Sequence, residues 1–275
     1  RRYRVLVVDL VGLQLDQNGE PDCSEVATHV RSRGAHFLTA DREPGEPALR
    51  SGICFEYFPA LCREEEVLTL SAEGQYDAVI AAATRIPPGA RFVEGGVRIG
   101  AGTANMASAS FVNATAPLMN TPGFNSRATA QMVFKALLRV IPDLPLETLH
   151  QSVESNGFDT GQHLKEFPTR KLEGLRIAVL GFGNIGREVA LLARAFGMQV
   201  AVYARESLKD WVEAEGFEYC ATLQEAARGA SVISPHLGLG ALGPNGYANQ
   251  GIVDERVFAV LATGAVLINF DRGEL

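Results

Sequence analysis

The segment Arg176-Ile-Ala-Val-Leu-Gly-Phe-Gly-Asn-Ile-Gly186 decides the fold that the sequence predicts. Its apolar run, residues 177–180, is typical of a strand that is buried on both faces of a parallel sheet. The spacing of Gly181, Gly183 and Gly186 is G-x-G-x-x-G, and an amphipathic helix is expected directly after it. A strand, this turn and a helix form the arrangement that binds the pyrophosphate of a dinucleotide. The segment therefore predicts a Rossmann-type unit.

Each residue of this turn has an expected role in binding a dinucleotide. Gly181 allows the tight turn, Gly183 lets the backbone approach the pyrophosphate, and Gly186 lets the helix pack closely on the strand. Asn184 and Ile185 begin the helix, whose unpaired N–H groups attract an anion. A glycine-rich turn in another kind of α/β domain is the alternative explanation of the same residues.

Composition limits the classes of protein to which the chain can belong. Its 275 residues, 47% of them hydrophobic, are enough for two modest domains with buried cores. A formal net charge of −7, without a block of Lys and Arg, argues against a nucleic acid or an anionic membrane as partner. The four cysteines show no metal-ligand spacing, so no metal site is expected. No apolar run has the length of a membrane span, and the first residues do not resemble a signal peptide. We therefore expect a soluble, cytoplasmic protein.

Strands and helices alternate along the whole chain, which predicts an α/β protein with two doubly wound parallel-sheet domains. We place the first domain at residues 1–124 and the second at residues 125–275, which includes a crossover helix at residues 127–140. Strands of the first domain are expected within residues 3–13, 36–39, 75–80 and 97–99. In the second domain we expect strands at 177–180, 199–203, 231–234 and 265–269, and helices at 208–215, 223–228 and 254–262. Residues 150–172 are expected to form a surface connection.

The strand at residues 199–203 carries information about the cofactor. In a dinucleotide fold the corresponding strand usually ends in an acidic residue that binds the ribose 2′-OH of NAD. Here it ends in Ala204 and Arg205, so the repulsion toward a 2′-phosphate is absent and a guanidinium is present to bind it. These residues predict NADP(H), with NAD(H) as the alternative if Arg205 is only a solvated charge.

Four motifs resemble those of a known family, the D-isomer-specific 2-hydroxyacid dehydrogenases. They lie at residues 100–105, 120–125, 175–186 and 264–275, and the resemblance covers residues 76–275. It implies a flavodoxin-like substrate domain followed by the Rossmann domain, and a homodimer. It also implies an oxidoreductase that transfers a hydride between NAD(P)(H) and a small 2-oxoacid or 2-hydroxyacid.

The resemblance also assigns expected roles to individual residues. Arg272 matches the catalytic arginine that holds the substrate's carboxylate and carbonyl oxygen, a task suited to a guanidinium. Ala82 and Ala83 match a loop whose backbone N–H groups bind the substrate carboxylate, and His236 matches a position that lines the cofactor site. The alternatives are an ordinary arginine before a turn, ordinary packing of alanines, and a structural histidine.

Several positions depart from the family pattern. Ala104 stands where relatives carry Asp, and Gln131 stands where they carry Glu. The usual short turn after Ser234 is replaced by a longer, glycine-rich loop at residues 237–250, which we expect to be flexible.

The proton donor of the family is not found within the matched segments. A reductase needs an acid poised near neutral pH, and relatives supply a Glu and a His after the segment that here ends at Leu275. Three explanations are open: the pair lies beyond residue 275, the protein is a catalytically silent dinucleotide-binding sensor or scaffold, or its chemistry has diverged. We favour the first.

Overall fold

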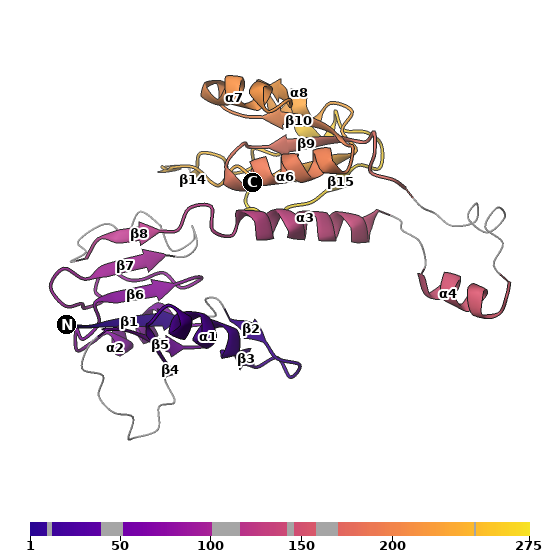
Figure 1. The fold of residues 1–275 in the computed structure, drawn as a ribbon. Coiled ribbons are helices and arrows are strands. Elements are labelled where there is room, and N and C mark those ends of the chain that lie inside the picture. Colours follow the sequence, from indigo (N-terminus) through magenta and orange to yellow (C-terminus); the bar gives the residue numbers. More distant parts are fainter. Residues whose placement is uncertain (10–12, 40–51, 101–115, 142–145, 158–169, 245) are drawn as a thin grey trace. The chain divides into compact units, whose positions relative to one another are not determined.

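The computed structural model describes residues 1–9, 13–39, 52–100, 116–141, 146–157, 170–244 and 246–275. The chain divides into two compact units, Arg1–Pro122 and Gly123–Leu275. Each unit contains a parallel sheet with helices packed on it (Figure 1). The predicted α/β fold class is therefore confirmed.

The first unit contains a six-stranded sheet in the order β4-β5-β1-β6-β7-β8, with parallel pairing throughout. Its strands are β1 (Arg2–Val8), β4 (His36–Thr39), β5 (Gly52–Phe58), β6 (Ala78–Ala81), β7 (Val97–Gly100) and β8 (Leu118–Asn120). Without the edge strand β4, this is the 2-1-3-4-5 order of flavodoxin-like sheets. A small antiparallel pair, β2 (Gln14–Leu15) and β3 (Pro21–Asp22), precedes the first helix.

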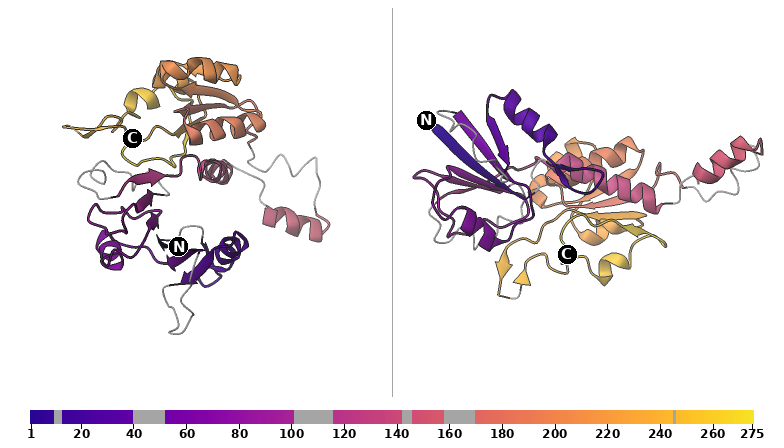
Figure 2. Two further views of the ribbon diagram at one scale, coloured as in Figure 1. Left: turned by 60° about the vertical axis from the view of Figure 1, so that its left-hand side comes forward. Right: turned by 90° about the horizontal axis from the view of Figure 1, so that it is seen from below.

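Two helices, α1 (Ser24–Ser32) and α2 (Glu64–Leu70), cover opposite faces of this sheet (Figure 2). Successive side chains of a strand point to opposite faces, so β1 contributes to both layers. Val5 and Val7 pack with α1, whereas Leu6 and Val8 pack with Val67 of α2. Burial of β1 on both sides fixes the position of Asp9, the residue that follows the strand.

The second unit contains a five-stranded parallel sheet in the order β11-β10-β9-β12-β15. Its strands are β9 (Arg176–Leu180), β10 (Gln199–Tyr203), β11 (Glu218–Cys220), β12 (Val232–Pro235) and β15 (Val266–Leu267). In sequence order this is 3-2-1-4-5, the arrangement of a Rossmann sheet with β9 in the centre. The Rossmann unit predicted from the glycine turn is therefore confirmed.

Helices cover both faces of this second sheet. On one face, α3 (Ser126–Val140) and α6 (Asn184–Ala195) pack against β9, and the rings of Phe134 and Phe196 stack with centroids 5.1 Å apart. On the other face lie α8 (Leu223–Ala227) and α9 (Glu255–Phe258). The 3₁₀ turn η3 (Glu206–Leu208) and α7 (Lys209–Ala214) follow β10. No helix within the described residues has the length and apolar character needed to cross a membrane.

Some predicted elements differ from those observed. Residues 150–154 belong to the helix α4 (Leu146–Glu154), which has no buried residue, so this part of the predicted surface connection is helical. The helix expected at 254–262 extends only over α9, and the strand expected at 265–269 is only β15, which begins after a turn at Gly264 with φ +72°. Strand β5 and helix α2 were not predicted at all.

Candidate functional site

The glycine turn lies between β9 and α6, at the centre of the Rossmann sheet. Gly181 has φ +109°, a conformation that favours glycine, and its N–H donates to the carbonyl oxygen of Tyr203 at 2.8 Å. A Cβ at this position would overlap the carbonyl oxygen of His236. The turn is therefore tied to the ends of both neighbouring strands, β10 and β12, and only glycine fits at its first position.

Gly186 and Gly183 differ in what a side chain would meet. A Cβ on Gly186 would overlap the carbonyl oxygen of Gly181, so the absence of a side chain lets α6 lie directly on the turn. A Cβ on Gly183 would meet none of the described residues within 4 Å. Open space therefore lies beside Gly183, at the start of α6.

This open space suits an anion because of the helix that begins there. Asn184 and Ile185 are the first residues of α6, and N–H groups in the first turn of a helix have no acceptor within the helix. The positive end of the helix dipole adds to their attraction for an anion. The side-chain amide nitrogen of Asn184 also lies 3.6 Å from the point that a Cβ on Gly123 would occupy, so Gly123 lies beside the turn. The backbone fits a dinucleotide pyrophosphate.

Ala204 and Arg205 follow the end of β10, beside the turn. Ala204 is buried, with 4% of its surface exposed, whereas Arg205 is exposed and precedes η3. The carbonyl oxygen of Tyr203, the residue before Ala204, accepts the N–H of Gly181. Ala204 and Arg205 therefore lie next to the glycine turn. An exposed guanidinium is thus available where a Rossmann fold binds the ribose of its cofactor.

A cluster of aromatic and charged side chains that the sequence did not predict packs around Phe182 of the turn. Phe182 is buried and contacts Trp211 and Phe217 edge-on, with centroids 5.3 and 6.0 Å away. Glu215 accepts hydrogen bonds from Arg187 Nε at 2.6 Å and from Trp211 Nε1 at 2.7 Å. These contacts join α6 to α7 across the turn. The sequence showed the aromatic residues but not that they meet.

His236 follows β12 and backs the same turn. Its N–H donates to the carbonyl oxygen of Leu180 at 2.7 Å, and its Nε2 lies 2.9 Å from Ser234 Oγ. Its Nδ1 is buried and has no hydrogen-bond partner among the described residues. Burial lowers the pKa of His236 to about 4, although the nearby carboxylate of Asp271 acts in the opposite direction. A neutral imidazole at physiological pH does not serve as a proton donor.

The loop after β12, expected to be flexible, is an antiparallel hairpin of β13 (Leu242–Gly243) and β14 (Gly246–Tyr247). Gly238 anchors its base: its N–H donates to Asp271 Oδ2 at 2.8 Å, and its carbonyl oxygen accepts from Asn249 Nδ2 at 2.9 Å. These hydrogen bonds connect the two ends of the loop to each other and to Asp271, and the flexibility of the loop stays a prediction.

Arg272 follows β15 and is half-buried. Its carbonyl oxygen accepts from Asn269 Nδ2 at 3.1 Å. The next residues are bonded to the segment after the hairpin, with Gly251 N–H donating to Glu274 O at 2.7 Å and Val253 N–H to Leu275 O at 2.8 Å. These hydrogen bonds fix the course of the backbone around Arg272.

Four predicted positions therefore share one edge of the Rossmann sheet. The glycine turn follows β9, Arg205 follows β10, His236 follows β12 and Arg272 follows β15. The carboxyl ends of parallel strands lie at the same edge, which is where open α/β sheets bind ligands.

Ala82 and Ala83 lie in the first unit, after β6, and their N–H groups are already engaged. Together with the N–H of Thr84 they donate to Asp9 Oδ2, at 3.0, 2.9 and 2.9 Å. Asp9 Oδ1 accepts from Thr84 Oγ1 at 2.6 Å and from Cys62 N–H at 3.1 Å. The prediction of open donors for a substrate carboxylate is corrected, because the protein's own carboxylate occupies them.

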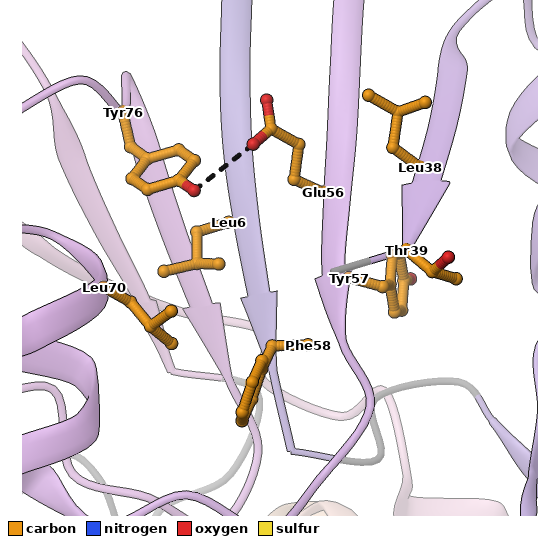
Figure 3. Close-up of a pocket in the computed structure, with 8 residues that line it drawn as sticks. All are labelled: Leu6, Leu38, Thr39, Glu56, Tyr57, Phe58, Leu70 and Tyr76. Carbon is orange, nitrogen blue, oxygen red and sulfur yellow. Dashed lines mark hydrogen bonds between the residues drawn. The ribbon is translucent and has the colours of Figure 1, made fainter. Parts of the chain in front are cut away.

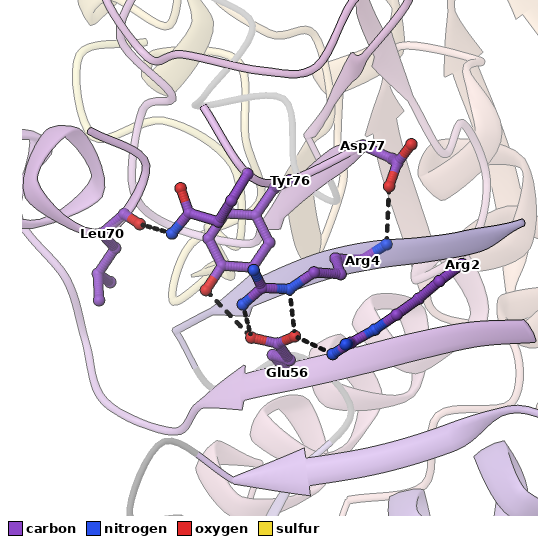
Figure 4. A network of polar contacts seen from close by, with 7 residues as sticks. Arg2, Arg4, Glu56, Leu70, Tyr76 and Asp77 are labelled. Atoms are coloured by element: carbon purple, nitrogen blue, oxygen red, sulfur yellow. Dashed lines mark hydrogen bonds and ion pairs between the residues drawn. The ribbon is translucent and has the colours of Figure 1, made fainter. Parts of the chain in front are cut away.

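A second feature of the first unit lies on the sheet beside α2. Figure 3 shows a cavity of about 180 Å³ lined by Leu6, Leu38, Thr39, Glu56, Tyr57, Phe58, Leu70 and Tyr76. Glu56 pairs with Arg4 through two hydrogen bonds of 2.7 Å and accepts from the Tyr76 hydroxyl at 3.2 Å (Figure 4). Burial beside Glu56 raises the pKa of Tyr76 to about 12. The carboxylate of Glu56 in the wall of the cavity is thus already paired with groups of the protein.

Ala104 and Asn105 lie outside the described residues. Gln131 is exposed on α3. Within the described residues, no group of three or more His, Cys, Asp or Glu side chains could hold a metal ion.

The fold and the glycine turn define the second unit as a Rossmann dinucleotide-binding domain. Residues 144–275 match the family model described as D-isomer specific 2-hydroxyacid dehydrogenase, NAD binding domain. The resemblance that the motifs predict is thus confirmed for residues 144–275, which are similar to the NAD-binding domain of that family.

Individual relatives match parts of the chain. Glyoxylate reductase from Thermococcus litoralis is 29% identical over 155 residues, which cover 56% of this chain and 45% of the relative. D-3-phosphoglycerate dehydrogenase from Haemophilus influenzae is 26% identical over 159 residues, which cover 57% of this chain and 35% of the relative. The match thus spans less than half the length of these relatives.

A solved structure extends the likeness of the fold to the whole chain. The cofactor (NAD+)-bound 3-phosphoglycerate dehydrogenase of Entamoeba histolytica has a TM-score of 0.62 at 16% identity. The comparison covers 100% of this chain and 73% of that protein.

Proposed function

We propose that this protein is a reductase that transfers a hydride between NADP(H) and a small 2-oxoacid, or the reverse with a 2-hydroxyacid. The observation that carries the proposal is the shared edge of the Rossmann sheet, where the glycine turn, Arg205, His236 and Arg272 all follow strand ends. The nicotinamide, when bound, supplies or accepts the hydride. The protein's part is to bind, to orient and to exclude water.

The preference for NADP(H) rests on two side chains after β10. Ala204 brings no carboxylate that would repel a 2′-phosphate, and the exposed Arg205 brings a guanidinium that can bind it through two N–H groups. The Entamoeba histolytica relative is described with NAD+. The proposal for this chain therefore differs from that structure in the cofactor, and the difference can be tested at Arg205.

In the proposed reaction, Arg272 orients the substrate. A 2-oxoacid is anionic, and its carbonyl oxygen gains negative charge as the hydride arrives, so one guanidinium can stabilise both groups. His236 stays neutral because burial lowers its pKa to about 4, which suits a wall of the cofactor site rather than a proton donor.

The second candidate is a dinucleotide-binding sensor or scaffold without turnover. It is favoured by one observation in the first unit: Asp9 occupies the N–H groups expected to hold the substrate carboxylate. The two candidates agree on cofactor binding and differ on the consumption of NADPH.

The test compares wild type with Arg205→Ala, using the protein as its reading frame encodes it. NADPH affinity is expected to fall about 10-fold to 100-fold, since a charge-assisted hydrogen bond contributes about 1.5–3 kcal/mol. NADH affinity is expected to stay within about 3-fold, because NADH has no 2′-phosphate. Arg228→Ala is the matched control: Arg228 is also exposed, but it precedes β12 and so lies near the opposite edge of the sheet.

Unchanged NADPH affinity in Arg205→Ala would remove the argument for NADP(H). Oxidation of NADPH is then measured with glyoxylate, pyruvate, hydroxypyruvate and branched or aromatic 2-oxoacids. Saturable turnover with one of them supports the reductase. Tight cofactor binding without turnover on any of them supports the sensor or scaffold.

A further inference from the structure

The cavity of the first unit lies on the face of the sheet that carries α2 (Figure 3). Parallel pairing places Leu38 of β4, Glu56 of β5 and Leu6 of β1 side by side in one row on this face. Val67 of α2 packs on Leu6, at one end of the row. At the other end, Leu38 is buried, yet it belongs to neither of the two core clusters formed by described residues of this unit. Leu38 and Leu70 of α2 both line the cavity, which therefore lies between β4 and the helix.

The size and the wall of the cavity suit a small apolar group. Its volume is about 180 Å³. An apolar cavity of about 150 Å³ can stay free of water and hold one benzene molecule. The side chains of the wall are mostly apolar, with buried ones inside and partly exposed ones toward the surface: Leu6, Leu38 and Tyr76 are buried, and Thr39, Phe58 and Leu70 are partly exposed. A ligand can therefore reach the cavity from the surface and lose its contact with water inside.

The charged group of the wall is already bonded to the protein (Figure 4). Both oxygens of Glu56 accept from Arg4, and Oε2 also accepts from the hydroxyl of Tyr76. Because the pKa of Tyr76 is raised to about 12, its phenol keeps the proton that it donates. An ionised ligand would find the carboxylate already paired, and burial of a charge without a partner is unfavourable. The wall therefore favours a neutral ligand over a charged one.

We propose that this cavity is a binding site for the neutral, apolar group of a small molecule, of about the size of a benzene ring. An aromatic ring or a branched aliphatic chain fits this description, whereas a ring that carries an ionised substituent does not. The ligand supplies apolar contacts to Leu38 that the core clusters do not provide. The site is built from residues of the first unit alone, and it does not depend on the proposed function.

Leu70→Trp tests the cavity by filling part of it with a side chain of the protein. Leu70 is the last residue of α2 and is partly exposed, so the larger ring has space on the side of the cavity. Leu68→Trp is the matched control, because Leu68 lies on the same helix, is 38% exposed and is not among the residues that line the cavity. The two variants carry the same substitution and differ in whether it enters the cavity.

The experiment follows the methyl NMR signals of the leucines in the full chain, without cofactor, during titration with benzene. In wild type the signals of Leu6 and Leu38 are expected to move saturably, while those of Leu172 and Leu223, in the cores of the second unit, stay in place. Leu70→Trp should weaken the affinity for benzene at least about 10-fold, and Leu68→Trp should leave it within about 3-fold. Sodium benzoate, which adds a carboxylate to the same ring, should bind at least about 10-fold more weakly than benzene.

The proposal is overturned if the signals of Leu6 and Leu38 in wild type do not move at the highest soluble concentration of benzene. Equal affinity of the two tryptophan variants would also contradict it, since the filled cavity would then bind as well as the empty one. If Leu70→Trp does not fold, the comparison of benzene with benzoate on wild type decides. Benzoate that moves the same signals with equal affinity contradicts a site for neutral groups. Because neither cofactor nor 2-oxoacid is present, a failure of NADPH turnover leaves this result unaffected.

Discussion

The glycine turn allows a substitution that separates cofactor binding from folding. Gly183→Ala adds one methyl group at φ −85° and ψ −167°, an extended conformation that alanine adopts without strain. The added Cβ meets none of the described residues within 4 Å, so it projects into the open space where a pyrophosphate would approach the backbone. Gly186→Ala places the same methyl group against the carbonyl oxygen of Gly181.

The two variants should therefore fail in different ways. Gly183→Ala is expected to keep or gain stability, by about 0.4–1 kcal/mol, because alanine restricts the unfolded chain. Its cofactor affinity should fall at least about 10-fold, which corresponds to about 1.4 kcal/mol of lost contact with the pyrophosphate. Gly186→Ala should lose about 1–3 kcal/mol of stability through overpacking, partly offset by about 1 kcal/mol of helix propensity.

The assay pairs urea unfolding with titration of NADPH and NADH for each variant and wild type. Because the pyrophosphate is common to both cofactors, Gly183→Ala should weaken the two equally, unlike Arg205→Ala. Full cofactor affinity in Gly183→Ala would show that the backbone there is not the pyrophosphate site. A marked loss of stability in the same variant would show that the space beside Gly183 is not open.

Three further predictions concern other residues. As pH falls from 6.5 to about 4, His236 is protonated in the unfolded chain but not in the folded chain, so the free energy of unfolding should fall by about 3 kcal/mol. Urea unfolding of His236→Gln should lack this part of the pH dependence. A pH profile identical to that of wild type would refute the prediction. Arg272→Ala should lower kcat/KM for the 2-oxoacid at least about 100-fold with cofactor affinity retained; an equal loss of both would assign Arg272 to structure. The expected homodimer is tested by sedimentation of a double variant, Leu146→Glu and Val153→Glu, at apolar side chains of α4 that are 72% and 56% exposed; a wild type that is monomeric contradicts it.

The Rossmann unit was predictable because its signals are local. The apolar run of β9, the three glycines and the amphipathic α6 are contiguous in the sequence, so periodicity and spacing suffice to predict them. The predicted crossover helix, at residues 127–140, agrees with α3 to within one residue for the same reason.

Strand β5 was not predicted because its stability depends on a distant residue. Its apolar run is interrupted by Glu56, a charge that normally argues against a buried strand. The charge is compensated by Arg4 of the neighbouring strand β1, 52 residues earlier, which approaches it through two hydrogen bonds. The sequence of residues 52–58 alone does not indicate that Arg4 is the partner of Glu56.

The candidate sites show the same division between what is local and what is not. Strand ends can be located from sequence, and both Asp9 and Ala82 follow the ends of apolar runs, β1 and β6. Because parallel strands bring their carboxyl ends to one edge, the sequence predicts that such residues lie at the edge where open α/β sheets bind ligands. It does not predict that a residue 73 positions earlier already fills the expected donors, since this depends on the left-handed φ of Asp9 and on Thr84. A backbone site predicted from the type of loop must therefore be checked for an internal ligand before a substrate is assigned to it.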